Sequence, residues 1–101
     1  MAKKIEQTFH QNEDIIAAIA RGTIGGILGV APLQDSDKGH FHIDISGDRV
    51  FIDVNINADY DAKIPDLAYE IQTRIKKDIA RRTKYSVEKV NVNIISVIMP
   101  I

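Results

Sequence analysis

The stretch NADYDAKIPDLAYEIQTRIKKDIARRTKYSVEKVNVNIISVI, residues 57–98, joins a long helix pattern to a strand pattern. Ile64-Pro65-Asp66 opens the helix, because proline fits the first helical turn and the helix dipole favours a carboxylate there. Apolar residues then recur every three or four positions, which is the period of an amphipathic helix: Ile64, Leu67, Ala68, Ile71, Ile75 and Ile79. We therefore predict a helix over residues 65–83 with one apolar face.

The end of the same stretch has the alternation of a strand. Apolar residues occupy every second position from Val90 to Ile94, and from Ile95 onward the alternation shifts by one residue. A strand presents successive side chains to opposite faces of its sheet. The shift therefore predicts either a β-bulge or a segment that is buried on both faces.

A hairpin is predicted upstream, around a two-residue turn at Gly47-Asp48. This turn places six pairs of residues opposite each other: Ser46–Arg49, Ile45–Val50, Asp44–Phe51, Ile43–Ile52, His42–Asp53 and Phe41–Val54. Three of these pairs are apolar, and all three lie on one face. An arbitrary register would not match apolar residues three times in succession. We expect paired strands over residues 41–46 and 49–56, with Phe51 on the outer, polar face.

The first third of the chain has weaker patterns. Ile5, Gln7 and Phe9 indicate a short first strand, because apolar and polar residues alternate there. Asn12 is a candidate N-cap for a helix over residues 13–25, which the glycines of residues 22–29 would end. A loop follows over residues 31–39. The predicted order is β-α-β-β-α-β, an α+β two-layer sandwich with two helices on one face of a small mixed sheet, in one domain over residues 1–101.

Composition narrows the classes of function. The 101 residues contain no cysteine, which excludes disulfides, thiolate catalysis and cysteine-ligated zinc and suits a cytoplasmic protein. The net charge of −1 argues against nucleic-acid binding by the molecule as a whole. Residues 1–62 carry five Lys/Arg and ten Asp/Glu, whereas residues 63–101 carry eight and four. No apolar run reaches the ~20 residues that span a bilayer, and we expect a soluble chain.

The quoted stretch resembles the C-terminal half of the alkaline shock protein family, the cell-envelope stress proteins of Gram-positive bacteria. The specific match runs from Tyr60 through Ile64-Pro65 to Val97. Residues 15–20 resemble the opening helix of the family, and Gly29-Val30 resembles the Gly-Val pair that follows this helix. The resemblance implies a non-enzymatic, cytoplasmic protein without a cofactor, at the inner face of the membrane and held there by a membrane-anchored partner. The glycines of residues 22–29 and the tail ending at Ile101 depart from the pattern and leave self-assembly and anchoring open.

The candidate partner-binding residues are a group of cations at the end of the predicted helix and one outward aromatic side chain: Arg74, Lys77, Arg81, Arg82 and Lys84, together with Phe51. Lys76 belongs to the same group of cations. Such a group suits an acidic partner or an anionic lipid surface. The alternative is a solvated helix face on which Glu70 pairs with Arg74 and Asp78 with Arg82.

Two further patterns in the sequence could indicate a binding site. His40, His42 and Asp53 are weak candidates for a metal site, because two imidazoles and a carboxylate could supply three ligands; a solvated polar face is the alternative, and we predict no metal. Gly22-Thr23-Ile24-Gly25 resembles the Gly-x-x-Gly loop of KH domains and gives the alternative function, a small nucleic-acid-binding module. Only Arg21 is a basic neighbour, so the end of a helix is the simpler interpretation. No grouping of residues indicates an enzyme.

The sequence also predicts self-association. Phe51 faces outward from the hairpin, and the final strand ends in Ser96-Val97-Ile98-Met99-Pro100-Ile101, which is apolar for an exposed end. An unpaired apolar strand edge tends to acquire a partner. We expect a homodimer or a larger assembly that uses the outer face of the sheet or the last strand.

Overall fold

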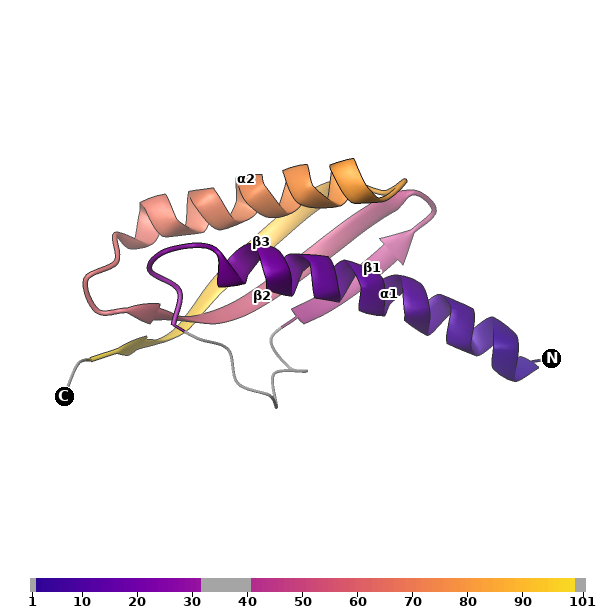
Figure 1. Ribbon diagram of the computed structural model, residues 1–101, viewed down its shortest axis with the longest axis horizontal. Coiled ribbons are helices and arrows are strands. Elements are labelled where there is room, and N and C mark those ends of the chain that lie inside the picture. The colour runs from indigo at the N-terminus through magenta and orange to yellow at the C-terminus, as the bar shows by residue number, and fades with distance from the viewer. Residues whose placement is uncertain (1, 32–40, 100–101) are drawn as a thin grey trace.

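The computed structural model describes the backbone of residues 2–31 and 41–99, and the side chains of residues 12–31 and 41–99. Its elements follow in the order α1 (Ala2–Gly25), β1 (Phe41–Ser46), β2 (Arg49–Asp59), α2 (Ile64–Arg82) and β3 (Ser86–Ile98). The three strands form one sheet, and both helices cover the same face of it (Figure 1). The predicted α+β class with two helices on one face is confirmed.

The sheet is mixed, with β2 in its centre. β1 and β2 pair antiparallel, while β2 and β3 pair parallel through the crossover helix α2. All six predicted pairs of the hairpin are present, from Phe41 opposite Val54 to Ser46 opposite Arg49. Gly47 has a φ of 63° and no other residue of the turn has a positive φ, which fits a two-residue turn with glycine at its first central position.

The phase shift in the last strand is a bulge. The register between β2 and β3 slips between Ile56 and Asn57, so that Ile56 pairs with Ile94 and Asn57 with Ser96. Ile95 is the extra residue of β3 at this point. The structure therefore confirms the first of the two interpretations of the sequence pattern.

The core lies between the helices and the inner face of the sheet. The apolar side of α2 is buried as predicted, and α2 begins and ends within one residue of the predicted bounds. β2 contributes every second residue, and α1 adds its second half. These buried residues form one cluster: Ile16, Ile19, Ala20, Ile24, Ile27, Val50, Ile52, Val54, Ile56, Ala58, Leu67, Ile71, Ile75, Ile79 and Val90.

The first predicted strand is wrong. Residues 5–9 belong to α1, which runs without interruption from Ala2 to Gly25, so that the element order is α-β-β-α-β. Asn12 lies inside this helix and is not its N-cap. Ile5 and Phe9 are four residues apart, which suits one face of a helix as well as alternate positions of a strand. The predicted end of the helix at Gly25 is confirmed.

The segment after α1 returns to the sheet. The Ala31 N–H donates to the Asn57 carbonyl and the Asp59 N–H donates to the Gly29 carbonyl, both at 2.8 Å. Val30 thereby forms a bridge with Ala58, beyond the end of β1. The last residues of β2 are therefore paired on both sides. The rest of the predicted loop, residues 32–39, lies outside the described residues.

Candidate partner-binding surface

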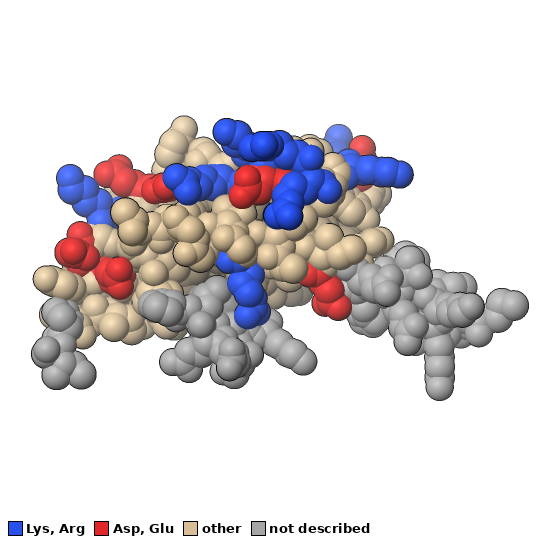
Figure 2. Space-filling view, viewed as in Figure 1, with Lys and Arg blue, Asp and Glu red and all other residues tan. Residues whose placement is uncertain are grey.

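Helix α2 has two chemically different sides. Leu67, Ile71, Ile75 and Ile79 are buried against the sheet and α1. The opposite side is exposed, and from Arg74 onward it carries cations. The basic surface, as we name it, consists of the exposed residues Arg74, Lys76, Lys77, Arg81, Arg82 and Lys84. In Figure 2, Lys and Arg side chains gather over the second half of α2.

Most of this positive charge is not neutralised locally. Glu70 pairs with Arg74 at 3.0 Å, which is one of the two pairs that the alternative interpretation of the sequence expects. Asp78 does not pair with Arg82; its carboxylate instead accepts a hydrogen bond from the Thr23 hydroxyl of α1 at 2.6 Å. Within residues 12–31 and 41–99, the other five cations of the basic surface form no ion pair. The structure thus leaves more free positive charge there than the sequence pattern predicts.

The end of α2 holds these cations in place. Arg81 and Arg82 are in the last turn of α2, where the negative end of the helix dipole favours positive charge. Thr83 caps the helix: its N–H and its hydroxyl both donate to the Ile79 carbonyl, at 2.9 and 2.7 Å. The Thr83 oxygen also accepts a hydrogen bond from the Tyr85 N–H. The turn that carries Lys84 is therefore tied to the helix end.

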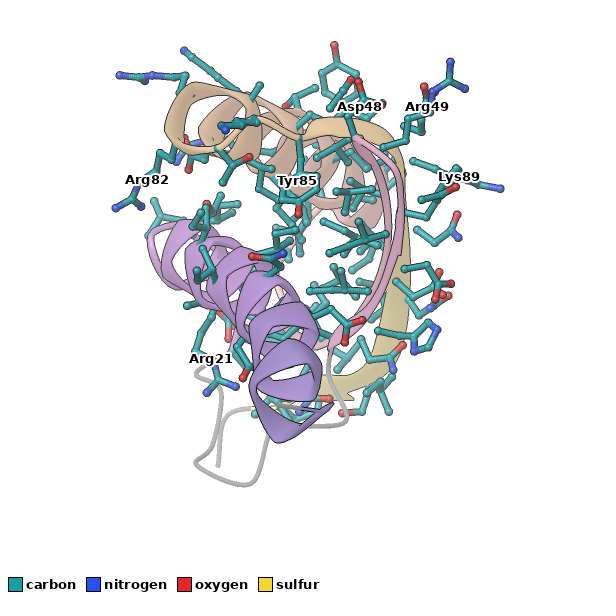
Figure 3. All side chains as sticks on the ribbon, turned by 90° about the vertical axis from the view of Figure 1, so that its right-hand side faces the viewer. Arg21, Asp48, Arg49, Arg82, Tyr85 and Lys89 are labelled. Carbon is teal, nitrogen blue, oxygen red and sulfur yellow. The ribbon has the colours of Figure 1, made fainter. Side chains whose placement is uncertain are left out.

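Phe51 is not part of this surface. It lies on the outer face of the sheet, in register with Asp44 of β1 and Lys89 of β3, and 39% of it is exposed. Figure 3 shows Arg82 and Lys89 pointing away from opposite sides of the molecule. The structure therefore divides the predicted partner-binding residues between two faces, with the cations on the helix layer and Phe51 on the sheet.

The outer face also carries a ladder of paired polar side chains, which the sequence analysis did not predict. Asn91 donates to Asp53 at 2.7 Å, Asn93 to Asn55 at 3.1 Å, and the Ser96 hydroxyl to Asn57 at 2.7 Å. These pairs link β2 to β3 at every second position. The register of the parallel pair would indicate them, but the sequence pattern predicts only the antiparallel register.

The candidate metal ligands are directed to different partners. His42 Nε2 lies 3.4 Å from Asp44 Oδ2, and Asp53 accepts the hydrogen bond from Asn91. His40 lies outside the described residues. In the part of the chain whose side chains are described, no group of three or more His, Asp or Glu residues could hold a metal ion.

The glycine pattern of residues 22–25 is the last turn of α1, not a loop between helices. Thr23 faces α2 through its hydrogen bond to Asp78, and Ile24 is fully buried. A KH loop presents its backbone to a nucleic acid, whereas these two side chains point into the protein. Arg21 lies with its guanidinium 5.9 Å from the centre of the Phe41 ring.

A family model for alkaline shock protein 23, described by a cell envelope-related function, matches residues 1–99. The chain belongs to this family. The match covers both helices and all three strands, and it confirms the resemblance seen in residues 60–97. No curated protein matches the chain. In the described part of this family member, neither helix is long and apolar enough to cross a membrane.

Solved structures of similar fold include three zinc-form structures of MamM CTD variants. Two of them share 13% and one shares 14% of residues with this chain, and their TM-scores are 0.56, 0.56 and 0.57. The alignments cover 89–90% of this chain and 88–89% of the other. At this identity the likeness concerns the fold alone.

Proposed function

We propose that this family member is a non-enzymatic adaptor of the cell-envelope stress response. In this proposal, the basic surface binds an acidic segment of a membrane-anchored protein at the inner face of the membrane, and the chain works as a homo-oligomer. The observation that carries the proposal is the group of five cations on α2 and its following turn without an ion pair in the described structure. The cell envelope-related description of the family supports the cellular setting.

The polar groups of the described residues favour binding over catalysis. The most regular arrangement, the ladder between β2 and β3, consists of amides, a carboxylate and a hydroxyl that are paired with each other. A catalytic group has to reach a substrate with a free donor, acceptor or nucleophile. The cations of the basic surface that form no ion pair suit recognition of carboxylates or phosphates.

The basic surface is exposed, so each contact with a partner is weak. An exposed ion pair contributes about 0–1 kcal/mol, and salt screens it over about 8 Å at physiological ionic strength. Tight binding therefore needs several cations at once. We expect the affinity for the partner to fall as the salt concentration rises.

The test removes two cations from the basic surface and compares the effect on binding with that of removing two cations elsewhere on the molecule. Arg81→Gln/Arg82→Gln takes two charges from the basic surface and keeps residues that favour a helix. Lys63→Gln/Lys89→Gln takes the same charge from exposed positions outside it. Each variant is used to recover the membrane partner from native cells, and the affinity for the soluble segment of that partner is then titrated.

We expect the arginine variant to bind up to about 30-fold more weakly, because two exposed ion pairs contribute at most about 2 kcal/mol. The lysine variant should bind like the unaltered chain. Equal weakening in both variants would show that overall charge, not the basic surface, determines binding. Binding to phosphatidylglycerol vesicles without a protein partner, or recovery with RNA, would contradict the adaptor proposal.

A further inference from the structure

The sheet has two edge strands, β1 and β3, and the outer side of each is unpaired in the described structure. The sheet order places β3 at one side, and its 13 residues make it the longest strand. On the opposite side, β1 has six residues, and the segment of residues 29–31 continues the pairing along β2. A long open edge offers backbone donors and acceptors to another strand. β3 therefore offers the longer of the two open edges at which the sheet can be extended.

The two halves of β3 differ in their protection. The first half carries the charged residues Glu88 and Lys89, and the Gln72 amide of α2 donates to the Val90 carbonyl at 3.1 Å. Charged side chains and a covering helix are ways in which proteins block strand pairing at an edge. Beyond Val90, within the described residues, the only side chains that bond to β3 are those of the ladder on β2. The second half of β3 lacks such protection.

The second half of β3 is also the most apolar exposed part of the sheet. Ile95 is 59% exposed and Met99 66% exposed, and Val97 and Ile98 lie between them with nearly half of their surface in solvent. From Val90 to Ile101 the sequence has no charged residue. In Figure 1 this end of β3 extends away from α2. An apolar, uncharged edge favours pairing with an uncharged strand.

We propose that the second half of β3 pairs antiparallel with the same segment of a second copy, across a two-fold axis near Ser96. The inference rests on the self-association part of the proposed function and assigns its interface. A second copy suits this edge because a two-fold axis near Ser96 sets Ser96 opposite itself and Ile95 opposite Val97 of the copy. Like charges close to the axis would repel each other, and residues 90–101 have no charged side chain. The pairing makes a continuous six-stranded sheet.

The first test places a charge on the interface. Ile95→Lys sets two lysines close to the axis, and the fold tolerates it because the Ile95 side chain is mostly in solvent. Ile15→Lys on α1, where Ile15 is 52% exposed, is the matched control. Sedimentation equilibrium of the full chain should give twice 11.3 kDa for the unaltered protein and for the control. Ile95→Lys should raise the Kd of the dimer about tenfold or more.

The second test uses the absence of cysteine from the sequence. Ser96→Cys should form a disulfide-linked dimer under mild oxidation, because paired positions near the axis bring the two Cβ atoms to about 4.5–5.5 Å. Ser86→Cys, at the start of the same strand, should stay reduced. Equal cross-linking of both variants, or of neither, would overturn the proposed axis.

The outcomes separate this inference from the adaptor proposal. A monomer at all concentrations, or a dimer that Ile95→Lys leaves intact, overturns the pairing through β3 and leaves binding by the basic surface standing. A dimer that Ile15→Lys disrupts equally also overturns it. Since residues 90–101 carry no charge, the dimer should persist at salt concentrations that release a partner from the basic surface.

Discussion

The Thr23 hydroxyl of α1 donates a hydrogen bond of 2.6 Å to the Asp78 carboxylate of α2. The same hydroxyl oxygen lies 2.9 Å from the Ile19 carbonyl of its own helix. The pair joins residues of two helices that are 55 positions apart in the sequence. It also engages the carboxylate that the helical spacing would pair with Arg82.

Thr23→Val should destabilise the fold, because it leaves the partly buried Asp78 carboxylate without its donor. The loss of a hydrogen bond to a charged group costs about 1–3 kcal/mol. Urea denaturation followed by circular dichroism measures it. Thr73→Val is the control, since the exposed Thr73 hydroxyl bonds only to carbonyls of its own helix. A loss of the same size in both variants would contradict a contribution from the link between the helices.

Ile75→Ala should be among the most damaging single truncations. Ile75 is fully buried at the middle of the apolar side of α2. Removing three carbons from such a site costs about 2–5 kcal/mol. Ile15→Ala, at a half-exposed position of α1, should cost less than about 1 kcal/mol. Melting temperatures that fall equally in the two variants would show that the assigned core is wrong.

Two glycine substitutions should have opposite signs. Gly29 has a φ of 99°, and an added Cβ would lie 3.3 Å from the Ala62 Cβ and 3.4 Å from the Leu67 Cδ1. Gly29→Ala should therefore cost about 1–3 kcal/mol. Gly22 lies inside α1 with no atom near its added Cβ, so Gly22→Ala should stabilise the fold by about 0.5–1 kcal/mol. Chemical denaturation of both variants measures the change in the free energy of unfolding. Changes of the same sign in the two variants would contradict the prediction.

The ladder on the outer face should contribute little to stability. Asn91→Ala removes the donor to Asp53, but both side chains are accessible to water, which replaces the bond. We expect a loss of no more than about 1 kcal/mol from the free energy of unfolding. A loss above about 2 kcal/mol would indicate that the ladder holds β3 to β2.

The predictable parts of the fold were those with two independent constraints. The hairpin register followed from a turn signal together with three apolar pairs, and α2 followed from Pro65 together with an apolar period over four turns. Residues 5–9 had only a three-position alternation, which a helix accommodates equally. The bulge at Ile95 was visible as a phase shift, because an extra residue reverses which face the following side chains occupy.

The candidate surface was only partly predictable. The period of α2 placed the cations opposite the apolar side, and Glu70 with Arg74 could be paired by their spacing. Which cations remain free depends on Asp78, whose partner Thr23 lies on another helix, and a contact between distant residues leaves no periodic signal. The separation of Phe51 from the cations likewise depends on how the helix layer packs on the sheet.

Both helices lie on one face of the sheet, and this determines how many partner molecules a dimer could bind from one side. Edge-to-edge antiparallel pairing of two such sheets has its two-fold axis perpendicular to the sheet, so both helix layers stay on the same side. Two basic surfaces would then face one plane, and a second weak contact would form at the effective concentration set by the first. Such an assembly would hold clustered partners far longer than isolated ones.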